Sequence, residues 1–283
     1  MPRKTILLSV EDHARDSAGM TYVYPVVSRR AGGVSIGINL NPNNACNWQC
    51  VYCQVPDLKR GGPPPIDLKQ LRRELTLFLD ELLSGRFMQD RVPVDARTLQ
   101  DVAFSGNGEP TLAAEFAESI KLVVDVLRKH SLLGKIKLRL ITNGSQLSKP
   151  DVQQGLAIMS THNGEVWFKL DGATNHQFAD INGVRVTTKA HLNRLRECAA
   201  LCPTWIQSCF FACNGQAPSA AEVDAYVDAI GQLVDVVIGV NLYGIARRSM
   251  QPQADRLGRL PATWFATLAK RLRRCGLKVA VSP

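Results

Sequence analysis

The chain has 283 residues and is 45% hydrophobic, so it is long enough to bury a substantial core within one α/β domain. No segment approaches the roughly 18 uninterrupted apolar residues of a membrane span, and the apolar run 6–10 is too short for a secretory signal, so we expect a soluble, cytoplasmic protein with reduced cysteines and no membrane contact. The formal charge of +9 favours an anionic partner such as RNA or a phosphorylated substrate, although the basic residues form no long run.

Residues 1–33 are predicted to be an irregular N-terminal extension, and residues 34–283 a single domain in which strands and helices alternate. The predicted strands are 34–40, 101–106, 135–142, 165–172, 204–211 and 234–243, with a short last strand at 277–282. The predicted helices are 67–84, 113–130, 149–159, 187–200, 219–233 and 262–276.

The order of these elements predicts the fold class. The strands are nearly continuous apolar runs joined by short connections, which is typical of parallel strands covered by helices. Right-handed crossovers then produce a curved sheet with the helices outside. A complete barrel usually has eight such units, so six predict a (β/α)6 partial TIM barrel that is open on one side. Ligands are expected at the carboxyl ends of its strands.

Three cysteines, Cys46, Cys50 and Cys53, lie within eight positions just after the first predicted strand. A zinc site would normally take four protein ligands, or three and a water. Three thiolates on one loop instead suit three irons of a [4Fe–4S] cluster, and the fourth iron would then be open to another ligand. A structural zinc loop and a set of buried reduced cysteines are the alternatives.

The pattern Cys46-x3-Cys50-x2-Cys53, with the aromatic Tyr52 before the third cysteine, resembles the signature of the radical S-adenosylmethionine (radical SAM) superfamily. The resemblance implies that S-adenosylmethionine binds the open iron through its amino and carboxylate groups. It also implies reductive cleavage to a 5′-deoxyadenosyl radical, which takes a hydrogen atom from a substrate. An external one-electron reductant of the flavodoxin or ferredoxin type is implied as the partner. The family fold is a six-stranded partial barrel, in agreement with the six units counted above.

The segment 104–112, FSGNGEPTL, follows the second strand and resembles the Gly-Gly-Glu motif that holds the amino group of S-adenosylmethionine in this family. Glycine allows a backbone to approach a ligand closely, and asparagine, which replaces the first glycine here, tolerates left-handed dihedral angles. An ordinary glycine-rich turn is the alternative. The resemblance implies cofactor contacts for Tyr52, Gly106, Asn107, Gly108 and Glu109.

Polar residues also follow later strands. Asn143 ends the third strand, and Lys169 and Asp171 share one side of the fourth. By the same resemblance they would contact the ribose or the methionyl end of the cofactor, with an Asn-Gly turn and a Lys–Asp ion pair as alternatives. Residues 238–240 are candidates for packing against adenine, and Arg247 is a candidate clamp for an anionic group or a surface ion pair.

A second group of cysteines, Cys198, Cys202, Cys209 and Cys213, is interpreted as buried thiols, with a second cluster or a catalytic thiol as alternatives. Cys213 is the candidate catalytic residue, because it lies just beyond the fifth strand.

The predicted function is that of a radical SAM enzyme acting on an unidentified small molecule or peptide, with the reaction class open. A tRNA-base-modifying radical SAM enzyme and a non-catalytic metal-binding regulator of nucleic acid are the alternatives.

Overall fold

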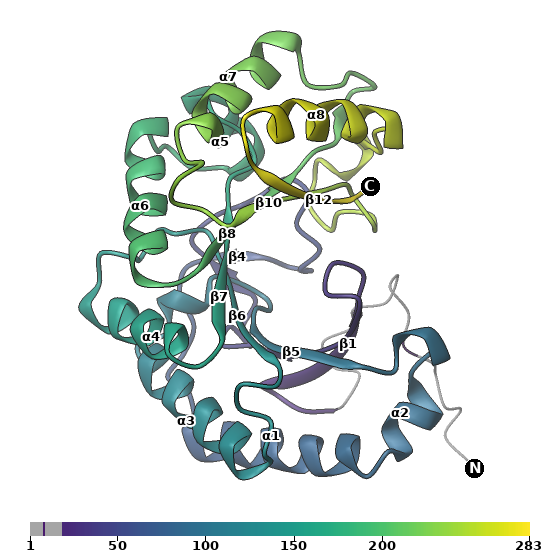
Figure 1. Cartoon of the computed structure of the whole chain (residues 1–283), viewed down its shortest axis with the longest axis vertical. Helices are drawn as coiled ribbons and strands as arrows, with labels where there is room; N and C mark the ends of the chain where they lie inside the picture. The colour runs from purple at the N-terminus through teal and green to yellow at the C-terminus, as the bar shows by residue number, and fades with distance from the viewer. Residues whose placement is uncertain (1–7, 9–18) are drawn as a thin grey trace.

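The structure is a computed structural model that describes residue 8 and residues 19–283. Its centre is a curved eight-stranded sheet with the strand order β1-β2-β5-β6-β7-β8-β10-β12 and helices along its outer side (Figure 1). These strands are β1 (Val23–Ser28), β2 (Gly33–Ile38), β5 (Leu99–Phe104), β6 (Lys137–Thr142), β7 (Gly164–Lys169), β8 (Thr204–Cys209), β10 (Gly239–Tyr243) and β12 (Lys278–Ser282). From β2 to β12 every neighbouring pair is parallel, so the predicted partial barrel is confirmed.

Six helices lie where they were predicted, and two shorter ones were not predicted. The predicted helices are α1 (Leu68–Leu83), α3 (Phe116–Lys129), α4 (Pro150–Ser160), α6 (Thr188–Leu201), α7 (Ala220–Gly231) and α8 (Ala262–Arg274). The additional helices are α2 (Arg86–Arg91) and α5 (Asn175–Asn182). Short elements complete the chain: β3 (Ala45–Cys46) with β4 (Lys59–Arg60), β9 (Ala212–Cys213) with β11 (Leu257–Gly258), and the 3-10 turns Val94–Ala96, Pro110–Leu112 and Ala254–Arg256.

The helix α1 illustrates how local sequence positions these elements. The Asp67 side chain accepts a hydrogen bond from Gln70 N at 2.9 Å and caps the helix, as its position before an apolar-periodic run predicts. Leucines and Phe78 at helical spacing are buried against the sheet.

The prediction of an irregular extension over residues 1–33 is wrong for residues 23–28. This segment forms β1, which pairs antiparallel with β2 and lies at the edge of the sheet. Pro25 lies within it, and proline is tolerated in an edge strand because no second neighbour needs its missing N–H. Residues 1–7 and 9–18 of the predicted extension lie outside the described part of the chain.

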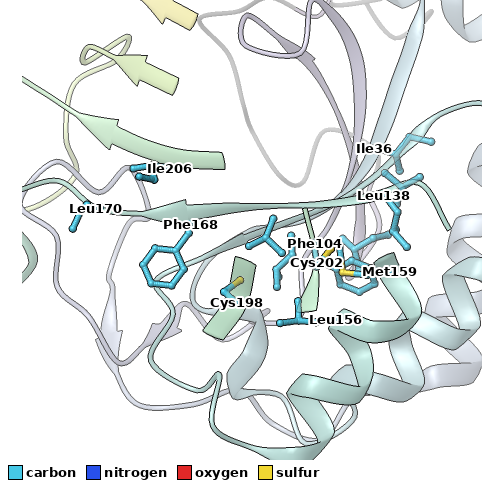
Figure 2. Close-up of a cluster of buried hydrophobic side chains, with 14 of the residues drawn as sticks. Ile36, Phe104, Leu138, Leu156, Met159, Phe168, Leu170, Cys198, Cys202 and Ile206 are labelled. Carbon is cyan, nitrogen blue, oxygen red and sulfur yellow. The ribbon is translucent and has the colours of Figure 1, made fainter. Parts of the chain in front are cut away.

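The two faces of the sheet differ in polarity. Apolar residues of the outer face pack against the helices, and Figure 2 shows Phe104, Leu138 and Phe168 in this layer. The inner face carries both apolar and polar residues, and the polar residues include Asp101 and Arg139. The expectation of uninterrupted apolar strands therefore holds only for the outer face. Across residue 8 and residues 19–283, no helix is both long and apolar enough to cross a membrane.

Candidate active site

The barrel encloses a cavity of about 300 Å³ that opens at the carboxyl ends of its strands. All three loop cysteines, Cys46, Cys50 and Cys53, line this cavity. The predicted cofactor residues that line it with them are Tyr52, Gly106, Asn107, Gly108, Glu109, Asn143 and Lys169. Residues from the ends of β5, β6 and β7 and from the cysteine loop therefore meet at a single site.

The cysteine loop is held by α5, the helix that was not predicted. The last carbonyls of α5 accept hydrogen bonds from the loop, from Gln49 N to Asn182 O at 3.0 Å and from Val51 N to Ile181 O at 2.8 Å. These bonds satisfy carbonyl groups that a helix end leaves without partners. Gly183 follows with a φ of 66°, a left-handed conformation that suits glycine and turns the chain away beneath the loop.

The opposite side of the loop is held by the segment after β10. Ser249 Oγ donates to Cys53 O at 3.1 Å, and Met250 N donates to the same oxygen at 2.9 Å. Asn182 Nδ2 lies 3.3 Å from Cys50 Sγ. The loop conformation is thus set by contacts from both sides before any cofactor is considered.

The thiols fit an iron–sulfur cluster in their chemistry. Burial is the main cause that raises the pKa of Cys46 to about 11 and of Cys50 to about 12, so these groups are thiols near neutral pH unless cations replace their protons. Among the described residues, no three His, Cys, Asp or Glu side chains are grouped as ligands of one metal ion. In a [4Fe–4S] cube each cysteine binds a different iron, and a cavity lined by three separate thiols accommodates that arrangement.

Tyr52, within the cysteine loop, is connected to the end of β7. Its hydroxyl donates to Asp171 Oδ2 at 2.5 Å and accepts from Lys169 Nζ at 2.6 Å. Burial alone would lower the pKa of Lys169, but the surrounding negative groups, Asp171 first, outweigh burial and hold it well above its usual value. Lys169 therefore contributes a permanent positive charge beside the loop.

Asp171, a predicted cofactor contact, is not among the residues that line the cavity and is bonded to the protein. Its Oδ1 accepts from Cys209 N at 2.9 Å, and its Oδ2 accepts from Tyr52 and, at 2.8 Å, from Asn182 Nδ2. The side chain is fully buried and is not among those that line the cavity. The i, i+2 spacing from Lys169 is not sufficient here because β7 ends at Lys169, so Asp171 lies beyond the regular strand. Asp171 is a positioning residue for the loop.

Glu109 joins the loops that follow β5 and β6. Its Oε1 accepts from Thr142 Oγ1 at 2.7 Å and from Thr111, and its Oε2 accepts from Asn143 N at 2.6 Å. Burial raises the pKa of this carboxyl group, and the hydrogen bonds oppose that effect. Glu109 fixes the backbone around Asn143 at the cavity wall.

Neighbouring protein atoms leave no room for a side chain at either glycine of the GNGEP segment, whether or not a ligand is bound. A Cβ on Gly106 would lie 2.4 Å from Asn39 Oδ1, and one on Gly108 would lie 2.0 Å from Ala45 O. The segment therefore packs directly against the end of β2 and the start of the cysteine loop.

Several lining residues were missed by the sequence analysis. They are inward-facing residues of the strands and of the turn between β1 and β2, and include Arg30, Ser35, Asp101, Arg139, Trp167 and Gln207. The available signal was the alternation of polar residues within segments such as LQDVAF and KLRLIT, which places them on one face of a strand.

Of the candidates at the fifth and sixth strands, only some line the cavity. Gly239 and Val240 begin β10, so they lie at its amino end and do not line the cavity, whereas Tyr243 and the residues after it do. Arg247 lines the cavity, and its Nε donates to Gln54 Oε1 at 2.9 Å. Cys213, in β9, is not a lining residue, so the geometry does not support it as the catalytic thiol.

The other cysteines separate into two environments. Cys198 and Cys202 are buried in the apolar layer between α6 and the sheet, with Leu156 and Met159 (Figure 2). Cys209 is buried at the end of β8 and lines the cavity.

Comparison with known proteins places this geometry in a structural class. No model of a protein family matches the chain. The chain is similar to a UPF0026 protein of Helicobacter pylori, with 32% identity over 136 residues that make up 47% of this chain and 37% of that protein. It is also 26% identical over 159 residues to a UPF0026 protein of Methanocaldococcus jannaschii, covering 56% of this chain and 42% of that protein. The chain thus spans less than half the length of these curated relatives.

Solved structures with a similar fold are radical SAM proteins. TYW1 with a lysine-pyruvate adduct has a TM-score of 0.56 at 17% identity, covering 86% of this chain and 74% of that one. A radical SAM methyltransferase from Sphaerobacter thermophilus has a TM-score of 0.56 at 13% identity, with 88% and 66% covered. SuiB of Streptococcus suis bound to S-adenosylmethionine has a TM-score of 0.53 at 12% identity, with 87% and 45% covered. The chain has the fold of the radical SAM enzymes, as the cysteine pattern predicted.

Proposed function

We propose that this protein is a radical SAM enzyme, with Cys46, Cys50 and Cys53 as the ligands of a [4Fe–4S] cluster and S-adenosylmethionine as its cofactor. The observation that carries the proposal is the convergence of three loop thiols on a cavity at the carboxyl ends of the strands in this fold. When bound and reduced by an external one-electron donor, the cluster would cleave S-adenosylmethionine to methionine and a 5′-deoxyadenosyl radical, which would take a hydrogen atom from the substrate.

The chain's own residues bind and orient these groups. The Cys46, Cys50 and Cys53 thiols lose their protons and hold the irons. Gly106, Gly108 and Asn143 present backbone and amide groups to the cavity wall, where the ends of S-adenosylmethionine would be hydrogen-bonded.

The Tyr52 network fixes the loop relative to the strands. Asp171 accepts from Tyr52 and Asn182, so it connects the tyrosine before Cys53 with the amide beside Cys50. Lys169 places its positive charge next to this loop, where it stabilises the negative charge of thiolate ligands.

The decisive experiment is anaerobic reconstitution with iron and sulfide. Iron and sulfide are then quantified, and 5′-deoxyadenosine is measured after addition of dithionite and S-adenosylmethionine. We expect a cluster and reductive cleavage. Protein that binds only zinc at the Cys46 loop and forms no 5′-deoxyadenosine would instead support a non-catalytic metal-binding protein.

A small molecule or peptide is the proposed substrate, because the candidate site is a cavity lined by strand and loop side chains and not a flat surface. The net charge of +9 makes a tRNA base the second candidate. Several phosphate contacts would make tRNA affinity fall steeply with salt, with a log–log slope of several units. A salt-independent affinity, or no binding of tRNA, would contradict that second candidate.

A further inference from the structure

The cavity continues into the barrel, away from the cysteine loop. Ser35 and Asp101 line it and lie in the first halves of β2 and β5, whereas the cysteines follow the carboxyl end of β2. Because β2 and β5 are parallel, the cavity has one end at the cysteines and another end deeper along the strands. The deeper end has its own set of side chains.

Two consecutive arginines enter the cavity from the turn between β1 and β2. Figure 1 shows the tip of this hairpin pointing toward the end of the chain, and Arg29 Nη1 donates to the main-chain oxygen of Pro283. Arg30 reaches across the barrel, where its Nη1 donates to Gln207 Oε1 on β8. The turn thus brings positive charge from one edge of the sheet to strands near the other edge.

Arg30 is held in place by neutral groups. Its guanidinium carbon lies 5.0 Å from the ring centroid of Trp167 and 4.8 Å from that of Tyr243. Stacking on two aromatic rings and one amide hydrogen bond orients the guanidinium without neutralising it. A guanidinium has five N–H donors, so it retains donor capacity for a ligand.

The charged side chains that line the cavity are mostly cations. The cavity is lined by the cations Arg29, Arg30, Arg139, Lys169 and Arg247 and by the carboxylates Asp101 and Glu109. Arg139 forms ion pairs with Asp101 and Glu165, and Lys169 Nζ lies 3.9 Å from Asp171 Oδ2. Arg30 has no carboxylate within ion-pair distance in the described part of the chain, whereas Arg29 already donates to the Pro283 oxygen.

The direction of the pKa shift of Arg29 agrees with an excess of positive charge around it. Burial lowers its pKa, and the neighbouring charges of Arg30 and Arg259 lower it further. Repulsion between cations that are held close together is relieved when an anion binds between them.

We propose that the cavity binds a small substrate carrying a carboxylate or phosphate group, and that Arg30, assisted by Arg29, holds this group. The inference rests on the proposed function, since it assigns the substrate class of the same site. Guanidinium groups match the planar or tetrahedral oxygens of such anions with paired hydrogen bonds. The anion would anchor the substrate in the cavity.

The test is calorimetric titration of the anaerobically reconstituted protein, saturated with S-adenosylmethionine so that its own carboxylate does not compete. Inorganic phosphate and malonate are the two probes, at constant ionic strength. We expect one molar equivalent of at least one probe to bind. In Arg30→Gln the affinity should fall at least about tenfold, the order expected for loss of a charge-assisted contact. Arg274→Gln, at the exposed end of α8, removes the same charge and should bind like the wild type.

The two probes distinguish the sources of the anion. Binding of phosphate alone supports a phosphorylated substrate, binding of malonate alone supports a carboxylic acid, and binding of both supports the shared chemistry. Failure of the wild type to bind either probe, or equal affinity of Arg30→Gln and the wild type, overturns the inference.

Circular dichroism and the thermal midpoint establish whether Arg30→Gln is folded. If it is not, Arg29→Gln, at an exposed position, replaces it and should weaken binding several-fold; an unchanged affinity would count against the inference. The readout is independent of catalysis. Normal anion binding without cleavage of S-adenosylmethionine would contradict the proposed function alone, and cleavage without anion binding would contradict this inference alone.

Discussion

Two cysteine pairs in this chain have the same spacing and opposite surroundings. Cys46 and Cys50 are separated by three residues on a loop at the cavity, and Cys198 and Cys202 are separated by three residues at the end of α6. The second pair is 0% and 2% exposed and lies in the apolar layer between α6 and the sheet (Figure 2). Spacing alone therefore does not make a metal site. The position of a pair relative to the carboxyl ends of the strands decides whether it can bind metal.

The largest effect expected from this comparison is the loss of one loop cysteine. Cys50→Ser should abolish cluster binding and the formation of 5′-deoxyadenosine, because serine oxygen is a poor ligand for iron in a cluster. Iron and sulfide content after anaerobic reconstitution measures this directly. Cys198→Ala is the matched control and should retain full iron content. A loss of cluster in both variants would show that the two pairs are not functionally different.

The second-largest effect is expected from substitution of Asp171, which orients the cysteine loop and does not line the cavity. Asp171→Asn keeps the volume but turns one acceptor into a donor facing Tyr52 and Asn182. We expect cluster affinity or turnover to fall roughly 10- to 100-fold, as for other residues that support metal ligands. The rate of iron loss to a chelator and the electron paramagnetic resonance spectrum of the reduced cluster are the readouts. Asp180→Asn, an exposed carboxylate on α5, is the control. Unchanged iron loss and an unchanged spectrum would refute the positioning role.

His191 lies between the two regions and makes stability depend on pH. Its Nε2 donates to Lys169 O at 2.8 Å, and its ring packs between Trp48 and Phe168. Burial is the main cause that lowers its pKa from 6.5 to about 4. The unfolded chain therefore takes up a proton first, so its contribution to stability is complete above pH 6.5 and is lost as the pH falls toward 4.

The loss between pH 7.5 and pH 5 should be about 2 kcal/mol. Urea unfolding of the wild type and of His191→Phe at both pH values measures it, and the phenylalanine variant should lose less stability on acidification. Equal losses in the two proteins would show that His191 does not carry this dependence.

The smallest effect belongs to the buried pair. Cys198→Ala should cost about 1–2 kcal/mol, because it removes the packed sulfur atom and its contact with Thr204. Denaturant unfolding measures this loss, and the cluster content should remain that of the wild type. A variant as stable as the wild type would show that the Cys198 site adapts to the missing atom.

The features that the sequence alone determined are local in the chain. The three cysteines, the GNGEP segment and the six strand–helix units each occupy short stretches, and their spacing was sufficient to predict the partial barrel and the place of the candidate site. The helix α1 with its Asp67 cap was likewise encoded within its own residues.

Only the tertiary structure decided what faces the cavity. Asp171 turns toward Asn182 and Tyr52, and Arg30 meets Gln207, a partner 177 positions away. The edge strand β1 and the helix α5, which holds the cysteine loop, were also not predicted, since each depends on a distant partner. Contacts of this kind arise from the curvature of the sheet, which brings separate strand ends together. That curvature cannot be deduced from the periodicity of any one segment.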